Sequence, residues 1–237
     1  LNAFIPARGG SKGIPGKNLR RLGKDTLLER TIKQGKSSSF VDKVIVSTDD
    51  EDMYRIAQDY DVATPALRPT FLATDEAKTI DVVLYTLEEM EIDSGYVLLL
   101  QTTSPLRMLD DINNLCKIFD KRADEAQAIV TVSEITSSHP DKIQKIEDGY
   151  LKSYLGKDSH VPRQSLPNVY ELNGACYLTH IDIIKEQRTF IPEKTIPFVM
   201  PIERSVNLDT MLDWYMLEKL IEEKVVSVEE YDVEIET

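Results

Sequence analysis

The sequence predicts an α/β domain with a mostly parallel sheet flanked by helices. Short β-branched or apolar runs alternate with stretches whose apolar residues recur at helical spacing, as in Tyr96–Leu100 and the preceding Thr79–Met90. Strands separated by helices of this length form right-handed βαβ units, which place the strands parallel. The 237 residues contain no internal repeat and no linker, so a single domain is expected to span residues 1–237.

The predicted elements follow one another along the chain. Asn2–Pro6 is a short strand, and Thr26 with Glu29 fits a capping box that starts the first helix. The next elements are the strand Lys43–Thr48, the helix Glu51–Asp59, a short strand at Val62–Ala63, the helix Thr79–Met90, the strand Tyr96–Leu100, a helix with Ile112, Leu115, Cys116 and Phe119 on one face, and the strand Ala128–Val132. The α/β pattern resumes at Gly174–Thr179 and ends with a helix over Leu208–Glu223.

Residues 136–172 interrupt this pattern. They are polar and rich in turn residues, with short candidate strands at Lys142–Ile146 and Tyr150–Tyr154. We interpret them as an inserted dimerisation or lid segment, which is either a flexible lid or an excursion that packs on another subunit.

The charge distribution narrows the class of ligand. The net charge of −13 disfavours nucleic acid and acidic membrane surfaces as partners, because both need a broad basic surface. No apolar stretch approaches the roughly 20 residues that cross a bilayer, and no signal peptide is recognised, so a cytoplasmic protein is expected. Against this acidic background, residues 1–24 carry six cations and no acidic residue. Such a cluster favours a small polyanionic ligand over a basic tail, because it interrupts a strand-to-helix transition.

The loop Ala7–Asn18 contains four glycines and three cations, a composition typical of phosphate binding. It fits neither common motif. A Walker A loop needs a glycine where Ser11 stands and a hydroxyl where Asn18 stands, and the dinucleotide spacing GxGxxG is absent. Because this loop, Thr48–Asp50 and Gln101–Arg107 all follow predicted strands, we expect them to share one edge of the sheet.

Five ordered motifs carry a family resemblance. The stretch IPARGGSKGIPGKN, followed by LQTTSPLR, RQSLP, NGACY and SVNLDTMLD, resembles the CMP-acylneuraminate synthetase (acylneuraminate cytidylyltransferase) family over residues 3 to about 215. The resemblance implies a reaction of CTP with a nine-carbon 2-keto sugar acid that gives the CMP-sugar and pyrophosphate. It also implies a Rossmann-like fold, a divalent metal (Mg²⁺ or Mn²⁺) and a homodimer.

The same resemblance implies roles for individual residues. The nucleotide is expected to contact Arg8, Ser11, Lys12, Lys17, Asn18, Arg68 and Thr79, and the catalytic residues are expected to be Arg8, Lys12, Lys17 and Asp209. Fixed cations suit this chemistry, because phosphoryl-type transfer depends on positioning and electrostatics. For Arg68 the sequence equally allows a surface residue before a turn-setting proline.

The sugar acid is expected to contact Gln101, Arg163, Gln164, Glu171 and Tyr177. Arg163 lies in the irregular segment, so it serves either its own site or that of a neighbouring subunit. Family members that use acetylneuraminate often carry Arg two residues before the Asn-Gly pair, where this chain has Glu171. The change favours a legionaminic- or pseudaminic-type acid over simple acetylneuraminate.

The metal is expected at Asn207 and Asp209, which match an Asp-x-Asp pair of the family. In an extended segment both side chains reach the same side, and Mg²⁺ accepts carboxylate and amide oxygens. Capping of the last helix is the alternative role for Asp209. Two alternative functions stay open: a cytidylyltransferase for the eight-carbon acid KDO, and a catalytically weakened nucleotide-binding regulatory module.

Overall fold

The computed structural model describes residues 1–157 and 160–228. It contains a six-stranded sheet in the order β10-β6-β9-β5-β1-β4. The strands are β1 (Asn2–Pro6), β4 (Lys43–Ser47), β5 (Tyr96–Leu100), β6 (Ala128–Glu134), β9 (Tyr170–His180) and β10 (Thr195–Val199). Strand β1 is parallel to β4 and β5, and β6 is parallel to β10, which confirms the mostly parallel α/β class.

Strand β9 departs from the predicted βαβ pattern, because it runs antiparallel to both of its neighbours, β5 and β6. The cause lies in the connection that precedes it. The chain leaves the sheet at the end of β6, makes an excursion and returns beside the strand that it left, as in a long hairpin, with Glu134 opposite Tyr170. The predicted strand Val62–Ala63 is only an isolated bridge between Ala63 and Ile45.

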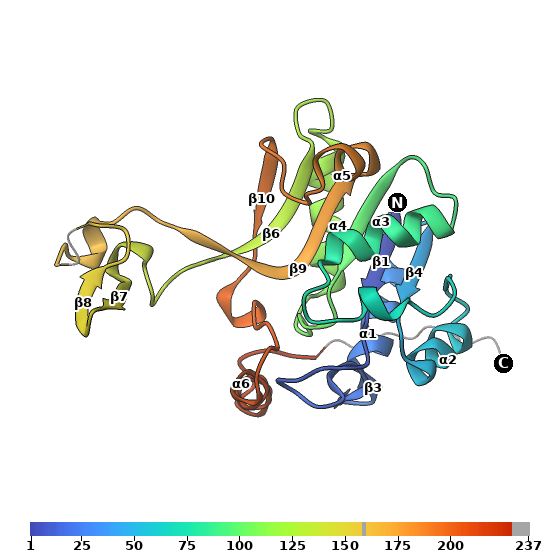
Figure 1. Cartoon of the computed structure of the whole chain (residues 1–237), viewed down its shortest axis with the longest axis horizontal. Coiled ribbons are helices and arrows are strands. Elements are labelled where there is room, and N and C mark those ends of the chain that lie inside the picture. Colours follow the sequence, from blue (N-terminus) through green and yellow to red (C-terminus); the bar gives the residue numbers. More distant parts are fainter. Residues whose placement is uncertain (158–159, 229–237) are drawn as a thin grey trace.

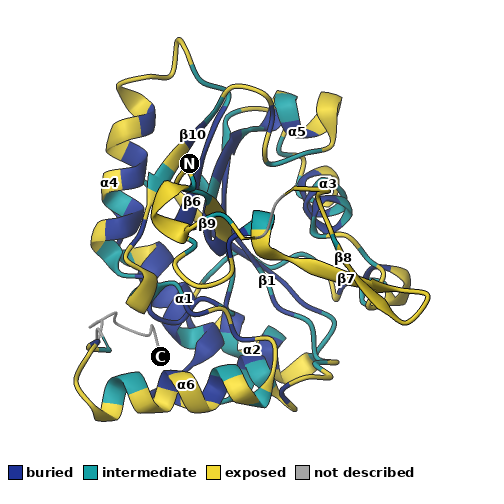
Figure 2. Cartoon of the chain, turned by 90° about the vertical axis from the view of Figure 1, so that its left-hand side faces the viewer, coloured by how far each residue is buried: buried dark blue, intermediate teal, exposed yellow. Residues whose placement is uncertain are grey.

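Helices cover both faces of the sheet. These helices are α1 (Leu27–Ser37), α2 (Glu51–Asp59), α3 (Thr79–Glu89), α4 (Leu109–Asp120) and α5 (Ile181–Gln187). A further helix, α6 (Met211–Glu222), packs against a loop instead. One core cluster joins the sheet to α1, α2 and α4, and a second joins its other face to α3 and α5 (Figure 2). The alternation of a pleated strand explains this division: in β5, Leu98 and Leu100 enter the first cluster, while Leu99 enters the second.

The helix starts follow from capping residues. The predicted capping box of α1 is confirmed, since Glu29 N donates to Thr26 Oγ1 at 3.1 Å and Thr26 N donates to Glu29 Oε2 at 2.7 Å. The last helix begins at Met211, three residues later than Leu208, because Thr210 and Asp213 form a capping box there. Leu208 instead lies buried in the extended segment that precedes α6, and a third core cluster packs α6 against the Ala7–Asn18 loop through Ile14, Leu208 and Trp214.

An arm projects from this body, as Figure 1 shows. It consists mainly of the hairpin β7 (Gln144–Glu147) and β8 (Tyr150–Ser153), which lies within the predicted excursion. The remaining short elements are the paired strands β2 (Arg21–Leu22) and β3 (Asp25–Thr26), and 3-10 turns at Lys17–Leu19, Thr70–Leu72, Pro140–Lys142, Arg163–Ser165 and Ile202–Arg204. None of the helices in the described ranges is both long enough and apolar enough to span a membrane.

Candidate functional site

A pocket of about 400 Å³, called here the central pocket, lies where β1, β4 and β5 end. It is lined by Pro6, Arg8, Ser11, Lys12, Gly13, Lys17, Asn18, Arg68, Leu72, Thr74, Asp75, Ala77, Thr79, Val82, Gln101, Thr102, Thr103, Asn207 and Asp209. The loops after β1 and β5 therefore meet at one edge of the sheet, as expected from parallel strands. The loop after β4 joins them, because Gly9 N donates to Asp49 Oδ1 at 3.0 Å.

Asn18 fixes the shape of the Ala7–Asn18 loop. Its side-chain nitrogen donates to the carbonyl of Arg8 at 2.9 Å, and its side-chain oxygen accepts from Thr102 Oγ1 at 2.6 Å. Both ends of a buried amide are thus satisfied, one by the loop itself and one by the turn after β5. Asn18 lies at the site, as expected, and it ties two walls of the pocket together.

Two of the predicted cations, Arg8 and Lys12, converge on Asp75. Arg8 Nη2 lies 2.6 Å from Asp75 Oδ1, and Lys12 Nζ forms an ion pair with Asp75 Oδ2. Hydrogen bonds from Lys12 and Arg8 lower the pKa of Asp75 below its ordinary value. Asp75 thus sets the spacing of two cations on one wall of the pocket. The resemblance also matches the segment 75–79 to one that contacts the nucleotide, but these ion pairs of Asp75 could not be predicted, because they form only in the folded chain.

Lys17 occupies a different environment from Lys12. Its side chain is 14% exposed, whereas that of Lys12 is 83% exposed. Its ammonium donates to the carbonyl of Leu208 at 2.6 Å and lies 3.8 Å from Asp209 Oδ1. Burial lowers the pKa of Lys17, Asp209 opposes that effect, and nearby Arg8 adds to it. Lys17 therefore presents positive charge at the pocket and also holds the segment that carries Asn207 and Asp209.

That segment, residues 200–210, is called here the strap. Its backbone is fixed from both sides, since Leu208 N donates to the carbonyl of Thr103 at 2.8 Å while Lys17 binds the Leu208 carbonyl. Gly13 approaches it so closely that a Cβ on Gly13 would lie 1.9 Å from the carbonyl oxygen of Asp209. The strap is thus docked directly against the Ala7–Asn18 loop.

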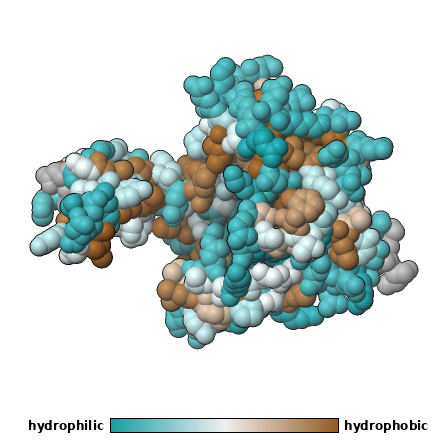
Figure 3. All heavy atoms as spheres, in the orientation of Figure 1, coloured by the Kyte–Doolittle hydropathy of each residue, from teal (hydrophilic) through white to brown (hydrophobic). Residues whose placement is uncertain are grey.

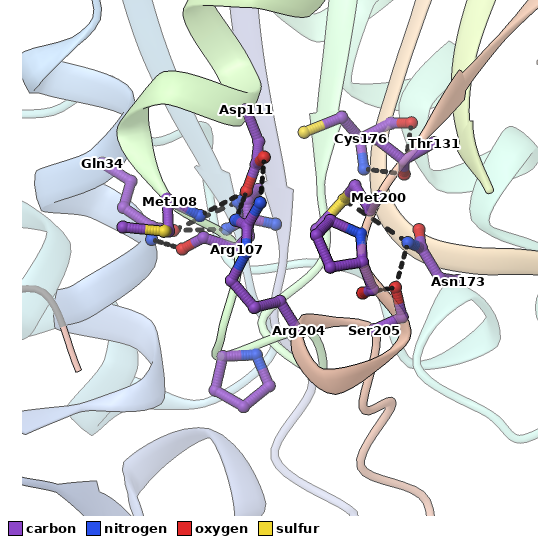
Figure 4. A network of polar contacts seen from close by, with 12 residues as sticks. Gln34, Arg107, Met108, Asp111, Thr131, Asn173, Cys176, Met200, Arg204 and Ser205 are labelled. Carbon is purple, nitrogen blue, oxygen red and sulfur yellow. Dashed lines mark hydrogen bonds and ion pairs between the residues drawn. The ribbon is translucent and has the colours of Figure 1, made fainter. Parts of the chain in front are cut away.

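An ion pair between the half-buried Arg204 and the buried Asp111 anchors the other end of the strap (Figure 4). Arg204 contacts both carboxylate oxygens of Asp111, one of them at 3.0 Å, and Asp111 also accepts from Met108 N at 2.8 Å at the start of α4. Nearby, Asn173 Nδ2 donates to Ser205 Oγ at 3.0 Å, which ties the strap to β9. Sequence analysis missed Arg204 and Asp111, because each alone resembles a surface charge.

We expect Arg204→Met to lower the free energy of unfolding by about 3 kcal/mol, because it leaves the nearly buried Asp111 carboxylate without its counter-charge. Equilibrium urea denaturation measures the change. In the matched double variant Arg204→Met with Asp111→Asn, much of the loss should be recovered, so the pair should show coupling in a double-mutant cycle. Additive losses from the two single variants would contradict this account.

Asn207 and Asp209 both line the central pocket, with Asn207 Nδ2 at 3.2 Å from Asp209 Oδ2. Asp209 does not cap α6, since Thr210 and Asp213 do so, and its side chain is 69% exposed toward the pocket. One carboxylate and one amide oxygen fit Mg²⁺ or Mn²⁺ only if further oxygen ligands come from substrate and water. In the described part of the chain, no three His, Cys, Asp or Glu residues gather as a complete metal site.

Arg68 is buried, so the alternative of a surface residue is wrong. Its guanidinium donates to the carbonyl and hydroxyl of Ser47 and to the carbonyl of Leu72, although it also lines the pocket. Burial lowers the pKa of Arg68, and Asp49 opposes the effect. The side chain supports the pocket wall that Thr79 continues at the start of α3.

Gln101 lies at the end of β5, beside Gly174 of β9. Its carbonyl accepts from the fully buried Arg107 at 3.1 Å; Arg107 also donates to the carbonyl of Ala175 at 2.6 Å and to Gln34 Oε1 at 2.7 Å (Figure 4). Arg107 thus clamps β5, β9 and α1 around Gln101. Sequence analysis missed this role of Arg107, because an arginine in a polar turn after a strand resembles a surface residue.

We expect Gly174→Ala to raise the KM of the sugar acid predicted at Gln101 by about tenfold, while the KM of the predicted nucleotide changes little. Gly174 has a φ of +76°, and an added Cβ would lie 2.5 Å from Gln101 Oε1, so Gln101 must move. Gly149→Ala on the arm is the matched control, because its φ is +80° but nothing lies within 4 Å of the added atom. Steady-state kinetics decides, and equal effects of the two variants would contradict displacement of Gln101.

A second cavity of about 310 Å³, called here the side cavity, adjoins the central pocket. It is lined by Thr79, Ile80, Leu99, Gln101, Tyr177, Arg188, Thr189, Phe190 and Ile191, so Thr79 and Gln101 belong to both hollows. The rings of Tyr177 and Phe190 lie 6.1 Å apart. Burial raises the pKa of Tyr177, which keeps its hydroxyl protonated as a hydrogen-bond donor.

The other residues expected at the sugar lie apart from these two hollows. Arg163 and Gln164 line a separate cavity of about 380 Å³ at the base of the arm, together with Glu134 and His139. Glu171 is exposed on β9 opposite Ser133, near the same base. Within one chain, the structure therefore brings together Gln101, Tyr177 and the predicted nucleotide residues, but not Arg163, Gln164 and Glu171.

Comparison with known proteins finds cytidylyltransferases and a synthase of a CMP-sugar acid. The family profile described as Cytidylyltransferase matches residues 3–226. The CMP-N,N'-diacetyllegionaminic acid synthase of Legionella pneumophila is 35% identical over 93% of this chain and 95% of its own length. The N-acylneuraminate cytidylyltransferase of Streptococcus agalactiae is 31% identical over 89% of this chain, which spans 51% of that protein.

Solved structures show the same fold. A CMP:2-keto-3-deoxy-manno-octonic acid synthetase complexed with CTP superposes with a TM-score of 0.66 at 15% identity, over 94% of this chain and 98% of that one. A 4-diphosphocytidyl-2C-methyl-D-erythritol synthase from Anaerococcus prevotii gives a TM-score of 0.61 at 16% identity, over 93% of this chain and 97% of that one. Together with the sequence matches, this shows that the chain belongs to the cytidylyltransferase family, a family of nucleotidyltransferase enzymes, as its motifs indicated.

Proposed function

We propose that this protein transfers CMP from CTP to a nine-carbon 2-keto sugar acid and releases pyrophosphate. The observation that carries the proposal is the wall that two hollows share: Thr79 and Gln101 line both the cationic central pocket and the side cavity that contains Tyr177. The first suits a triphosphate and the second suits a sugar, so their reacting ends would meet beside Gln101.

In the proposed reaction, the anomeric hydroxyl of the sugar attacks the α-phosphorus of CTP. A bond forms between that oxygen and phosphorus, the hydroxyl proton passes to water, the bond to the bridging oxygen breaks, and pyrophosphate leaves with the electron pair. Lys17 and Arg8 lie where they would stabilise negative charge on the phosphates, and Gln101 would orient the sugar. Their fixed positions, held by Asn18 and the strap, preorganise the site.

Asn207 and Asp209 would hold the divalent cation, Mg²⁺ or Mn²⁺, which would neutralise phosphate charge. Because Asn207 contributes no charge, we expect Asn207→Asp to lower the Mg²⁺ concentration for half-maximal activity on the order of tenfold. Mn²⁺ binding measured by electron paramagnetic resonance, with CTP present, provides a second readout. Unchanged metal dependence in both measurements would exclude Asn207 from the cation site.

The nine-carbon 2-keto sugar acids (nonulosonic acids) include the sialic, legionaminic and pseudaminic types, and we favour a legionaminic type as the substrate. The proposal rests on the L. pneumophila relative, which is named for N,N'-diacetyllegionaminic acid, and on Glu171 in place of an expected arginine. For an eight-carbon KDO substrate, the support is a structural similarity at 15% sequence identity, and a similarity at that level shows a shared fold and not a shared substrate. A regulatory module that binds CTP without turnover is the alternative of a different class.

A pyrophosphate-release assay tests the function. The purified protein is incubated with CTP, Mg²⁺ and, separately, legionaminic, pseudaminic, acetylneuraminic and KDO-type acids. We expect release that depends on both CTP and a nine-carbon acid. CTP binding by calorimetry without release from any acid would support the regulatory alternative instead.

We further propose that the arm pairs two copies of the chain into a homodimer in the cytoplasm, where CTP is available. The arm exposes large apolar side chains, including Ile146, Tyr150, Leu151 and Tyr154, each at least 64% exposed. Figure 3 shows hydrophobic atoms on the arm and on the adjoining side of the body. A single arm cannot bury this surface, whereas two reciprocal arms would, and they would also bring Arg163 to a neighbouring site.

The substitution Leu151→Lys tests the pairing, because it places a charge on the apolar surface of the arm. We expect this variant to be a monomer in analytical ultracentrifugation and the wild type to be a dimer. A monomeric wild type would refute the pairing.

A further inference from the structure

The segment Arg188–Ile191 closes one side of the side cavity. Arg188 ends α5 in the left-handed conformation, with φ of 49° and ψ of 45°, and its backbone N–H donates to the carbonyl of Ile184 at 3.1 Å. An arginine rarely adopts this conformation, so contacts around it must hold it there. One such contact lies at Phe190, whose carbonyl accepts from Thr179 Oγ1 of β9 at 3.1 Å.

A second contact joins Arg188 to α3. Its guanidinium pairs with Asp81, which lies in the first turn of α3, two residues after Thr79. Helices α3 and α5 cover the same face of the sheet (Figure 2). The Arg188 side chain is 61% exposed, and exposed pairs of this kind add little to stability. A contribution to stability therefore does not explain the pair between Arg188 and Asp81. Its position at the rim of the side cavity indicates instead that it orients the Arg188 guanidinium there.

The cavity itself is mostly apolar. Ile80, Leu99 and Phe190 supply hydrocarbon surface, whereas Gln101, the Tyr177 hydroxyl and the threonines at 79 and 189 supply polar atoms. Among the residues that line it, Arg188 is the one that carries a formal charge. The cationic loop and Asp209 line only the central pocket, so the side cavity extends away from them, beyond Gln101. A sugar whose reacting carbon lies at the phosphates would place its far end here.

We propose that Arg188, held by Asp81, is a specificity-determining residue that donates hydrogen bonds to the substituents at the far end of the sugar acid. This inference rests on the proposed function. A guanidinium has five N–H donors, so the bond to Asp81 orients the group and leaves donors for oxygen atoms of the ligand. The chemistry favours an acylamino group, whose carbonyl would accept a hydrogen bond from Arg188 while its methyl group contacts the apolar wall of the side cavity. A hydroxyl-rich side chain would leave hydroxyls against Ile80 and Leu99 without partners.

Kinetics with two sugar acids tests the proposal: N,N'-diacetyllegionaminic acid, whose far end carries an acylamino and a methyl group, and N-acetylneuraminic acid, whose far end carries hydroxyls. For Arg188→Ala we expect the KM for the diacetyl acid to rise about tenfold or more, with kcat and the CTP KM unchanged. The preference between the two acids should shrink by the same factor. Arg188→Lys should recover part of it, and Asp81→Asn should show a smaller loss in the same direction.

Lys185→Ala is the matched control, because Lys185 lies on the same helix and forms an exposed pair with Asp93 outside the cavity lining. Its kinetics should equal those of the wild type. An unchanged preference in Arg188→Ala, or equal changes for both acids and CTP, would overturn the assignment while leaving the proposed function intact. Absence of pyrophosphate release by the wild type with every acid would overturn both.

Discussion

Gly13→Ala should lower kcat/KM by about 100-fold, although the substitution adds a single methyl group. The added Cβ would lie 1.9 Å from the carbonyl oxygen of Asp209. The backbone of residue 13 fixes the position of the Cβ, and its partner is a backbone atom, so no side-chain rotation can relieve the clash. The strap must move by about an ångström, and displacements of that size at a reacting centre cost on the order of 100-fold. Steady-state kinetics with CTP and the sugar acid, together with the melting temperature, gives the two readouts.

Gly10→Ala is the control for this variant. Gly10 belongs to the same loop, but nothing lies within 4 Å of an added Cβ, and neither glycine has a positive φ. Both variants therefore remove similar backbone freedom, and only one displaces Asp209. Gly10→Ala should keep activity within about threefold of the wild type. Similar losses in both variants would show that loop flexibility, and not the docking of the strap, limits the reaction.

Lys17→Met should reduce kcat/KM for CTP by about 100- to 1000-fold, which is the range expected when a fixed donor to developing phosphate charge is removed. Two effects combine in this position. The half-buried ammonium supplies charge at the pocket, and its hydrogen bond of 2.6 Å to the carbonyl of Leu208 holds the strap that carries Asp209. Lys17→Arg should recover charge but not the geometry of the contact, so we expect partial rescue.

Lys12→Met is the comparison, because it removes the same charge from the same loop. Lys12 is 83% exposed and contacts Asp75, and exposed charge pairs are weak, so we expect a loss below about tenfold. The difference between the two variants measures what burial and the strap contribute. If Lys12→Met lost as much activity as Lys17→Met, loop charge alone would explain both, and the positioning role of Lys17 would be wrong.

Periodicity and capping chemistry made much of the fold predictable. The helix at Glu51–Asp59 and the strand Tyr96–Leu100 occur as expected, because local signals specify them: an aspartate cap in one case and a buried apolar run in the other. The direction of β9 could not be predicted, because it depends on where the chain returns after the arm. Strand β10 and helix α5 were also missed; both are short, and α5 spans only Ile181–Gln187.

The site divides in the same manner. The glycines and cations of the Ala7–Asn18 loop predicted the central pocket. Gln101 lines that pocket, as expected, because loops that follow parallel strands share one edge of the sheet. The residues that hold this arrangement gave no such signal. Arg107 and Asp111 are buried charged residues whose partners, Ala175 and Arg204, lie 68 and 93 positions away in sequence. Pairings over such separations exist only in the folded chain.

The arm is closed at its stem by two adjacent strands, with Glu134 opposite Tyr170. The connection between these two strands can therefore become longer or shorter without changing the register of the sheet. The entropic cost of a longer connection grows only with the logarithm of its length. The arm is thus a modular insertion point. Relatives of this chain could carry arms of different length and sequence, and so choose different partners, while the strands that frame Gln101 keep their positions.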